Sequence, residues 1–412
     1  MEDTYYTDKI VLNPNIEDNG IIKKSVKLNG NNYKILKYNK EEINENKELL
    51  KYRSVIFNND MLLSYSLPKS VKYNDFLEKN KDIMNENIVI TEIIEGTMIN
   101  LFYDPSNNKW EIASKGAIGG NYFFYRNGYD KSLKKKDQLT FKMMLLQSLG
   151  LNTDEEFIDF TDKLSRKYCY SFVLQHPENH IVLNINTPKL YLTSVWLIED
   201  KSATYIPIKQ FKEFTELKKI ESYIHYPNVY EKEDNYDEII NKYISDNNKL
   251  IVGLMYINEK TLDRTSIIQE TYKKMKDLRG NNPNLQYQYL TLKKIDKIKE
   301  FLTYFPQYKD IFYKFYLQYK NFLKEVHQAY FNMHIKKNKT TYPIKPKYFY
   351  HCNKLHHEIY LPSLTEGNKK IMNKTEVYNY FEKYDPIQQL YYLNYETEIM
   401  KQKNVLELLK IN

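Results

Sequence analysis

Short runs of apolar, β-branched and aromatic residues, separated by residues that favour turns, dominate the first two thirds of the chain. Ser54–Phe57 and Met61–Tyr65 flank the segment Asn58–Asp60, and this pattern predicts a β-hairpin. Ile93–Tyr103 and Trp110–Ser114 stand on either side of a polar connection that contains proline, which predicts a second strand pair. We therefore expect this region to be rich in paired strands.

Two predicted helices interrupt the strands. Leu139–Leu149 has apolar residues at helical spacing and stops at Gly150, and Thr153 with Glu156 predicts a capping box for a helix over Glu155–Leu164. Strand-like runs then resume, and they are Tyr168–Leu174, Ile181–Ile185, Leu190–Ile198 and Leu250–Tyr256. The pattern therefore predicts a mixed α/β or α+β domain over about the first 270 residues, and we take α+β as the class.

The pattern changes near Arg279–Pro283, where glycine, asparagine and proline cluster. Beyond this point apolar residues recur at helical spacing in one long segment, namely Ile311, Phe315, Tyr319, Phe322, Val326, Tyr330 and Met333. We therefore divide the chain into a core of residues 1–280 and an all-helical module of residues 281–412.

Composition and charge limit the classes of function. Of the 412 residues, 61 are Lys or Arg and 53 are Asp or Glu, and the net charge of +8 permits a nucleic-acid partner without establishing one. The 40 tyrosines supply rings for stacking, although a bias toward A/T-rich codons is the stronger explanation for them. No apolar run is long enough to span a membrane, and the two cysteines, Cys169 and Cys352, are too few for a disulfide framework. We expect a cytoplasmic protein without a membrane partner.

Several common sites are absent from the sequence. The eight histidines form no HExxH motif and no Cys/His pattern at ligand spacing, so we predict no metal site. The chain also lacks the GxGxxG, Walker A and GxSxG motifs. These absences argue against dehydrogenases, P-loop NTPases and α/β-hydrolases.

Four short segments in a fixed order carry a resemblance to a known family. They are Lys51–Phe57 (KYRSVIF), Glu92–Asn100 (EIIEGTMIN), Ser114–Gly116 (SKG) and Tyr170–Val182 (YSFVLQHPENHIV). Together they resemble the RG-hydrophobic hairpin, the KxDG motif, the small glycine loop and the FE strand of the phage-type RNA ligases. These enzymes are covalent nucleotidyltransferases, related to DNA ligases and mRNA guanylyltransferases. The resemblance covers about residues 45–270 and implies a nucleotidyltransferase core built on antiparallel sheets.

The sequence departs from the family at the positions that carry its chemistry. In such enzymes a lysine amine attacks the α-phosphate of ATP or GTP, and carboxylates hold the divalent metal. Here Ile93 stands where the KxDG lysine is expected, and Val173 and Val252 replace two carboxylates. The closing KxK motif corresponds to Arg264–Ser266, which keeps one cation. The resemblance therefore implies a pseudoenzyme without catalytic residues or cofactor. The alternative is an active enzyme that uses ATP or GTP with Mg²⁺ and a relocated nucleophile, for which Lys115 is the candidate.

A pocket that still binds a purine nucleotide needs stacking walls, a polar acceptor and cations. We assign the walls to Phe172 and Met255 and the acceptor to Glu95, with Trp110 and Trp196 as alternatives for stacking. Phe172 and Met255 are also typical of strand core residues. The resemblance places five basic residues around the nucleotide, and they are Arg53, Lys69, Lys72, Lys115 and Arg264, with Lys69 and Lys72 assigned to the RNA backbone. The runs Lys134–Lys136, Lys336–Lys337 and Lys339 extend this set, or are solvated surface.

The resulting hypothesis is a protein that binds RNA at its 5′ end, most concretely the methylguanosine cap of a viral mRNA, as in translation initiation. The helical region from Leu278 onward resembles the carboxy-terminal extension of RNA-ligase-like proteins of large DNA viruses, which implies the cytoplasm of an infected host cell. Two alternatives remain: an active RNA ligase or guanylyltransferase, and a protein-interaction scaffold whose helices bind a partner.

Overall fold

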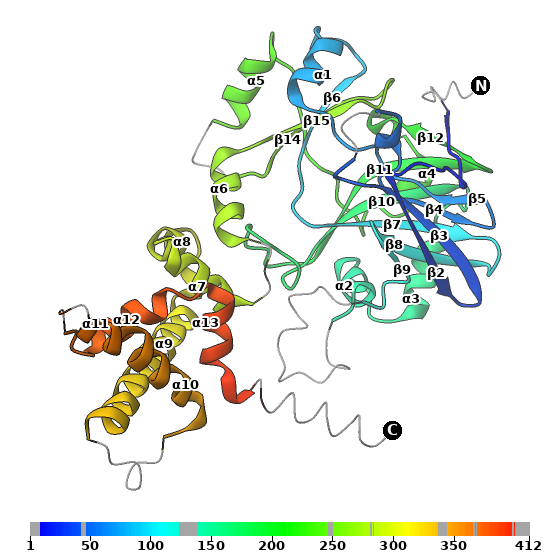
Figure 1. The fold of residues 1–412 in the computed structure, drawn as a ribbon. Helices are drawn as coiled ribbons and strands as arrows, with labels where there is room; N and C mark the ends of the chain where they lie inside the picture. Colours follow the sequence, from blue (N-terminus) through cyan, green and yellow to red (C-terminus); the bar gives the residue numbers. More distant parts are fainter. Residues whose placement is uncertain are drawn as a thin grey trace, which may run out of the picture. The chain divides into compact units, whose positions relative to one another are not determined.

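The computed structural model describes residues 9–42, 47–122, 139–211, 213–245, 250–280, 282, 284–336, 344–365, 367, 369–397 and 399. The chain divides into two compact units, Met1–Lys276 and Asp277–Asn412 (Figure 1). The first unit contains the sheets and the second unit is helical.

The largest sheet of the first unit has seven antiparallel strands in the order β1-β12-β11-β10-β7-β8-β9. The bounds of these strands are β1 Ile10–Val11, β7 Thr97–Asp104, β8 Lys109–Ser114, β9 Ala117–Ile118, β10 Tyr168–Gln175, β11 Lys189–Glu199 and β12 Ser202–Ile206. One face of this sheet is covered by helices α2 (Phe141–Ser148) and α3 (Asp154–Thr161), whose apolar residues share a core with Phe172 and Leu174 of β10 (Figure 1). Successive residues of a strand point to opposite faces, so Ser171 and Val173 point away from these helices.

Two further sheets have four antiparallel strands each. The first has the order β13-β6-β14-β15, with β6 Ile88–Glu92, β13 Val229–Tyr230, β14 Gly253–Asn258 and β15 Arg264–Ile268. Helices α1 (Tyr73–Lys79) and α5 (Tyr236–Tyr243) pack on one of its faces. The second has the order β2-β3-β4-β5, with β2 Ile21–Leu28, β3 Asn31–Tyr38, β4 Val55–Asn58 and β5 Met61–Ser64. The remaining short elements are the 3₁₀ helices Lys47–Lys51 and Ile208–Gln210 and helix α4 (Thr215–Lys218), and α6 (Glu270–Arg279) runs across the boundary between the units.

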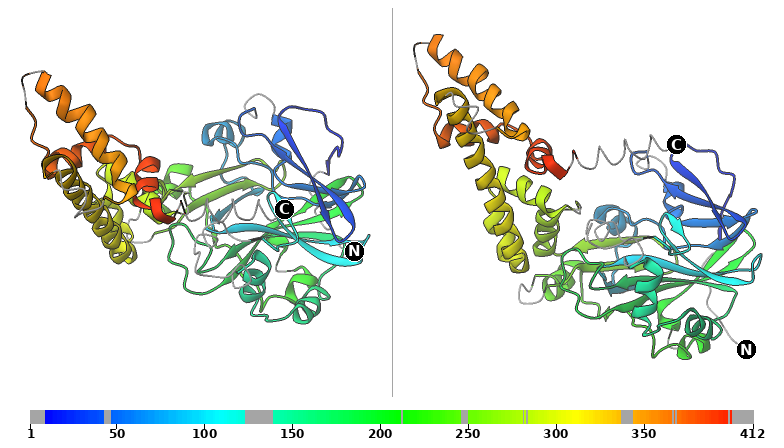
Figure 2. Two further views of the ribbon diagram at one scale, coloured as in Figure 1. Left: turned by 60° about the horizontal axis from the view of Figure 1, so that its bottom comes forward. Right: turned by 90° about the horizontal axis from the view of Figure 1, so that it is seen from below.

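The second unit is built around the 22-residue helix α9 (Lys309–Tyr330) (Figure 2). Its other helices are α7 Leu285–Lys294, α8 Ile298–Tyr304, α10 Pro346–Lys354, α11 Leu361–Thr365, α12 Lys374–Glu382 and α13 Pro386–Leu393, with π-helical turns at Phe331–Ile335 and Leu355–Tyr360 and a 3₁₀ turn at Pro306–Tyr308. Tyr319, Phe322, Val326 and Tyr330 are buried, as the helical spacing predicts. The first turn differs, because Phe312 rather than Ile311 or Phe315 is buried there.

The α+β class is confirmed, since antiparallel sheets and helices occur in separate layers. The hairpin at Ser54–Tyr65 and the capping box of Thr153 and Glu156 are also confirmed. The strand predicted over Ile181–Ile185 is wrong, and the one predicted from Ile93 begins only at Thr97. The Glu95 carboxylate, described below, accounts for the missing strand at Ile181–Ile185.

The structure describes only part of the lysine runs that the sequence analysis names. Lys134–Lys136, Lys337 and Lys339 lie outside the described residues. Within the described part of the chain, no helix combines the length and the apolar character needed to cross a membrane.

Candidate functional site

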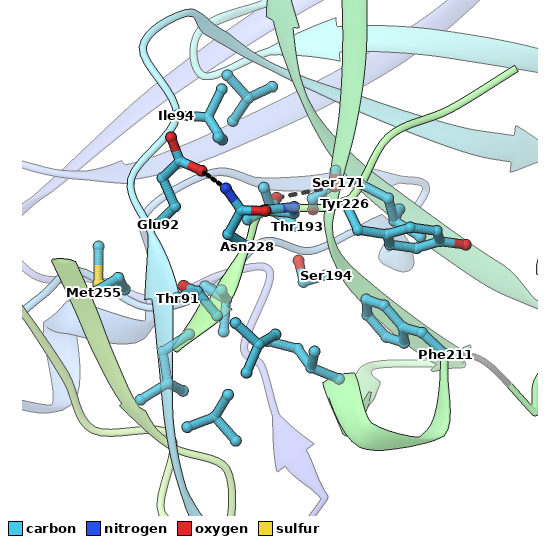
Figure 3. Close-up of a pocket in the computed structure, with 18 of the residues that line it drawn as sticks. Thr91, Glu92, Ile94, Ser171, Thr193, Ser194, Phe211, Tyr226, Asn228 and Met255 are labelled. Atoms are coloured by element: carbon cyan, nitrogen blue, oxygen red, sulfur yellow. Dashed lines mark hydrogen bonds between the residues drawn. The ribbon is translucent and has the colours of Figure 1, made fainter. Parts of the chain in front are cut away.

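A cavity of about 1340 Å³ lies in the first unit, between the seven-stranded sheet and the sheet that contains β6 (Figure 3). One wall consists of Ile88–Glu92 on β6 with Met255 and Ile257 on β14. The opposite wall comes from β10 and β11 and includes Ser171, Val173 and residues 192–194. This volume is above the range of about 300–1,000 Å³ that is typical of small-molecule sites.

Three of the four residues that the resemblance aligns with the family's catalytic groups line this cavity. Ile93, Val173 and Arg264 all line it, although they lie far apart in the sequence. The backbone N–H of Ile93 donates to the carbonyl of Gly253 at 3.0 Å, which fixes the loop between β6 and β7. Val252 is buried but does not line the cavity. The side chains that reach the cavity at Ile93 and Val173 are therefore aliphatic.

Two guanidinium groups, those of Arg53 and Arg264, line the cavity. Arg264 is 7% exposed, and its Nε donates to the carbonyl of Pro68 at 2.6 Å. Burial lowers the pKa of Arg264 well below its ordinary value, and the positive charge of Arg53 lowers it further. Burial also lowers the pKa of Arg53. Among the described residues, no carboxylate forms a salt bridge with either guanidinium, so both have unneutralised charge toward the cavity.

A further positive group, the ammonium of Lys115, contacts Tyr38. The Nζ of Lys115 donates to the Tyr38 hydroxyl at 3.0 Å and lies 4.2 Å from the centre of its ring. Burial alone would raise the pKa of Tyr38, but the hydrogen bond and the charge of Lys115 outweigh burial, with further help from Arg53 and Lys69. The pKa of Tyr38 is therefore lowered. Lys115 and Lys69 do not line the cavity, so their effect on a ligand there is electrostatic.

Glu95 does not occupy the place that the sequence predicts for it. Its carboxylate accepts hydrogen bonds from the backbone N–H groups of Ile181 (2.5 Å), Val182 (2.9 Å) and Leu183 (3.1 Å). It also accepts one from the Tyr272 hydroxyl at 2.9 Å, and the side chain is 6% exposed. Because these N–H groups bond to a carboxylate rather than to a neighbouring strand, residues 181–185 form no strand. The prediction of Glu95 as a reader of the base is corrected to a structural role.

Of the two predicted stacking walls, only Met255 lines the cavity, and its stacking role stays a prediction. Phe172 is fully buried on the face of β10 that packs against α2 and α3, so it is a core residue. Trp196 is also fully buried, with its Nε1 donating to Ser194, and Trp110 does not line the cavity. Met255 does line the cavity, on β14 next to Thr91 of β6 (Figure 3). The alternation of β10 alone explains the error at Phe172, because its neighbours Ser171 and Val173 point to the cavity.

Lys72 is exposed and directly precedes helix α1. It does not line the cavity. Its assignment to the RNA backbone therefore stays a prediction.

Several cavity residues carry no signal in the sequence. Glu92 and Asn228 meet through a hydrogen bond of 2.6 Å from the asparagine Nδ2, and both face the cavity (Figure 3). Three lysines, one further carboxylate and two aromatic residues line it from the segment after β12, and they are Lys209, Lys218, Lys232, Glu221, Phe211 and Tyr226. This segment contains no motif, and long-range pairing brings it to the cavity, through a bridge of His225 with Tyr191 of β11 and the pairing of β13 with β6.

The potential of the described residues for metal binding is limited. No group of three or more His, Cys, Asp and Glu side chains within the described part of the chain is arranged to hold a metal ion. The cavity has two carboxylates, Glu92 and Glu221, and five cationic side chains. The described walls therefore favour an anionic ligand whose charge is balanced by these cationic side chains.

No protein-family model matches the chain, and none of the curated proteins matches it. Solved structures of polynucleotide ligases do. A candidate ATP-dependent DNA ligase from Aquifex aeolicus matches 82% of this chain and 78% of its own length, with a TM-score of 0.40 and 10% identity. An RNA ligase from Naegleria gruberi, solved with ATP and Mn, matches 66% of this chain and 84% of its own length, with a TM-score of 0.36 and 11% identity. An archaeal ATP-dependent RNA ligase matches 66% of this chain and 62% of its own length, with a TM-score of 0.37 and 9% identity.

Proposed function

We propose that the first unit binds the 5′ end of RNA in this cavity and transfers no nucleotide. The observation that carries the proposal is the pair of guanidinium groups, Arg53 and Arg264, which face a large cavity without a carboxylate partner among the described residues. A buried charge without a counter-charge is costly, and perturbed groups of this kind cluster at functional sites. A phosphate group supplies the missing negative charge, and guanidinium groups bind phosphate through paired hydrogen bonds.

The absence of nucleotidyl transfer in this proposal follows from the side chains at the reacting positions. A phosphoramidate requires an amine that attacks the α-phosphate, and Ile93 has no nucleophilic atom. Val173 likewise provides no oxygen for a metal ion. Lys115 is a poor replacement nucleophile, because its ammonium group donates to Tyr38 and does not line the cavity.

The most concrete ligand is a methylguanosine cap. A methylated guanine carries positive charge and presents N–H donors on its edge, and both features favour a carboxylate acceptor. Glu92 takes the role that the sequence analysis gave to Glu95, since its carboxylate lines the cavity and is oriented by Asn228. Met255 offers a polarisable thioether surface for the face of the base. In this arrangement the cap phosphates lie against Arg53 and Arg264.

The test is an affinity titration with one short RNA prepared with four 5′ ends: methylguanosine cap, triphosphate, monophosphate and hydroxyl. Salt is held constant because phosphate contacts make affinity depend on salt, and EDTA removes divalent metal. We expect the hydroxyl end to bind most weakly and the cap to bind most tightly. Equal affinity for all four ends would refute recognition of the 5′ end, and a preference for the monophosphate would refute the cap.

Two variants with the same change in charge locate the site. Arg53→Gln is expected to weaken the binding of the phosphorylated and capped RNAs by about tenfold, which corresponds to the loss of one charge-assisted contact. Lys27→Gln removes one positive charge from an exposed position that does not line the cavity and that has no predicted RNA contact, and we expect little change. Equal losses in the two variants would show that only overall charge matters.

An active enzyme makes a different prediction. Incubation with ATP or GTP and Mg²⁺ or Mn²⁺ would then produce an acid-stable nucleotide adduct, detectable as an added mass on the intact protein. We expect no such mass. An adduct mapped to any lysine of the first unit would replace the proposed binding function with a nucleotidyltransferase.

A further inference from the structure

The cavity has a second group of cations, separate from the two arginines. They line it at exposed or half-buried positions, together with Tyr226, and we call this part of the cavity its mouth. Lys209 and Lys218 are exposed and Lys232 is half-buried, and all three line the cavity. The Nζ of Lys209 donates to the carbonyl of Glu86 at 2.5 Å, and the Nζ of Lys232 donates to the carbonyl of Asn85 at 2.6 Å. An ammonium group has three N–H donors, so each of these two lysines keeps donors for a ligand.

One member of each group, Arg264 and Lys232, lies at an opposite edge of one sheet. Arg264 is the first residue of β15, at one edge of the order β13-β6-β14-β15, and Lys232 follows two residues after β13, at the other edge. The register places them almost directly across from each other, because Arg264 pairs with Ile257, which pairs with Val89, while Tyr230 pairs with Ile90. Three strand spacings separate the two edges, or about 14 Å between backbones. Negative charge spread along a chain, as in an oligonucleotide, fits cations at both edges better than the single charged end of a mononucleotide does.

An aromatic ring lies at the same mouth. Tyr226 is 36% exposed and lines the cavity, and its ring centre is 6.2 Å from that of Phe211 (Figure 3). A half-exposed tyrosine supported by a second ring offers a face on which a base can stack. Stacking rings combined with lysines that follow a phosphate backbone are the usual means by which proteins bind single-stranded nucleic acid.

We propose that a single-stranded RNA leaves the cavity through this mouth. The nucleotide that follows the 5′-terminal one stacks on Tyr226, and its phosphate binds Lys209 and Lys232. This subsite rests on the proposed function, because it assumes that the 5′ phosphate is held by Arg53 and Arg264. Glu221 also lies at the mouth, but the three lysines outnumber it.

The experiment compares a 5′-phosphorylated mononucleotide, dinucleotide and tetranucleotide of RNA at constant salt. The wild-type protein is expected to bind the tetranucleotide at least tenfold more tightly than the mononucleotide. Lys209→Ala/Lys232→Ala and Tyr226→Ala should lose most of this gain, and their affinity for the mononucleotide should fall by much less than the gain with length. Retained binding of the mononucleotide also shows that the cavity of each variant is folded.

Matched controls separate stacking and local charge from general effects. Tyr226→Phe keeps the ring and should keep the gain with length. Lys27→Ala/Lys201→Ala removes two positive charges from exposed residues that do not line the cavity, and it should also keep the gain.

The remaining outcomes distinguish failure of the subsite from failure of the proposed function. Equal affinity of the wild-type protein for all three lengths would overturn the subsite and leave the proposed function intact. A gain with length that the lysine and tyrosine variants retain would also overturn it. If no length binds, the proposed function fails, and the subsite fails with it.

Discussion

Replacing Glu95 by Gln is expected to destabilise the first unit without changing which 5′ end it prefers. In the structure Oε1 accepts from Ile181 and Val182, and Oε2 accepts from Leu183 and Tyr272. An amide keeps one acceptor oxygen and replaces the other with an NH₂ group, which cannot accept from the N–H of Leu183. The substitution therefore removes both a negative charge and one acceptor from a buried site.

The magnitude follows from the contacts that are lost. Leaving one buried backbone N–H without an acceptor costs about 1–3 kcal/mol, and the Tyr272 hydroxyl can rotate to accept from the new amide. We expect a loss of about 2 kcal/mol in the free energy of unfolding, which lowers the melting temperature by roughly 4–8 °C for a unit of this size. Tyr272→Phe removes one hydrogen bond at the same carboxylate and should cost about 1 kcal/mol.

Thermal and urea unfolding, followed by circular dichroism, measure this loss. The matched control is Glu92→Gln, since Glu92 accepts a single side-chain hydrogen bond from Asn228 and lines the cavity. It should leave stability nearly unchanged and weaken the preference for the cap. The reasoning is refuted if the Glu95 variant unfolds like the wild type and loses its preference among 5′ ends, because Glu95 would then contact the ligand.

Three further predictions concern other parts of the chain. Arg264→Lys keeps the charge but loses the paired donors, so RNA with a 5′ phosphate should bind about tenfold more weakly while RNA with a 5′ hydroxyl is unaffected in the same titration. Gly96→Ala places a Cβ 2.4 Å from a carbonyl oxygen of β10 and should lower the melting temperature, whereas Gly116→Ala, whose Cβ has no atom closer than 3.7 Å, should not. Burial lowers the pKa of His351 to about 4, so the unfolded chain takes up a proton below its ordinary pKa of about 6.5 while the folded chain does not. Stability is therefore fully present above about pH 6.5 and falls toward pH 4, by about 2 kcal/mol between pH 7 and 5. His351→Gln should flatten this dependence in urea unfolding, and the exposed His357→Gln should not.

The sequence predicts those features of the fold that depend on local pattern. Alternation and turn residues identify the hairpin at Ser54–Tyr65, and the Thr153–Glu156 pair marks the start of a helix. The error at Ile181–Ile185 has a tertiary cause, because a carboxylate 86 residues earlier in the chain satisfies the amides of that segment. No local pattern contains this information.

The site could be predicted only where a motif fixes the position of a side chain. Ile93, Val173, Met255 and Arg264 line one cavity, and the roles that the resemblance gives them stay predictions. Phe172 was misassigned because a strand presents alternate residues to opposite faces, and the motif does not state which face is the cavity. The residues at the mouth could not be found, because long-range pairing brings them to the cavity. The proposed protein partner of the helical unit stays a prediction.

The most direct measurement of where the 5′ end binds is photo-crosslinking with an RNA that carries a 5′ phosphate and a photoreactive 5′-terminal nucleotide. Peptides crosslinked in the full-length protein are identified by mass spectrometry. The account predicts crosslinks to cavity segments, above all Ile88–Glu92 of β6 and Gly253–Asn258 of β14. The crosslinks should disappear when an excess of unlabelled 5′-phosphorylated RNA is added. Crosslinks confined to residues 277–412, or ones that persist under this competition, would contradict binding of the 5′ end in the cavity.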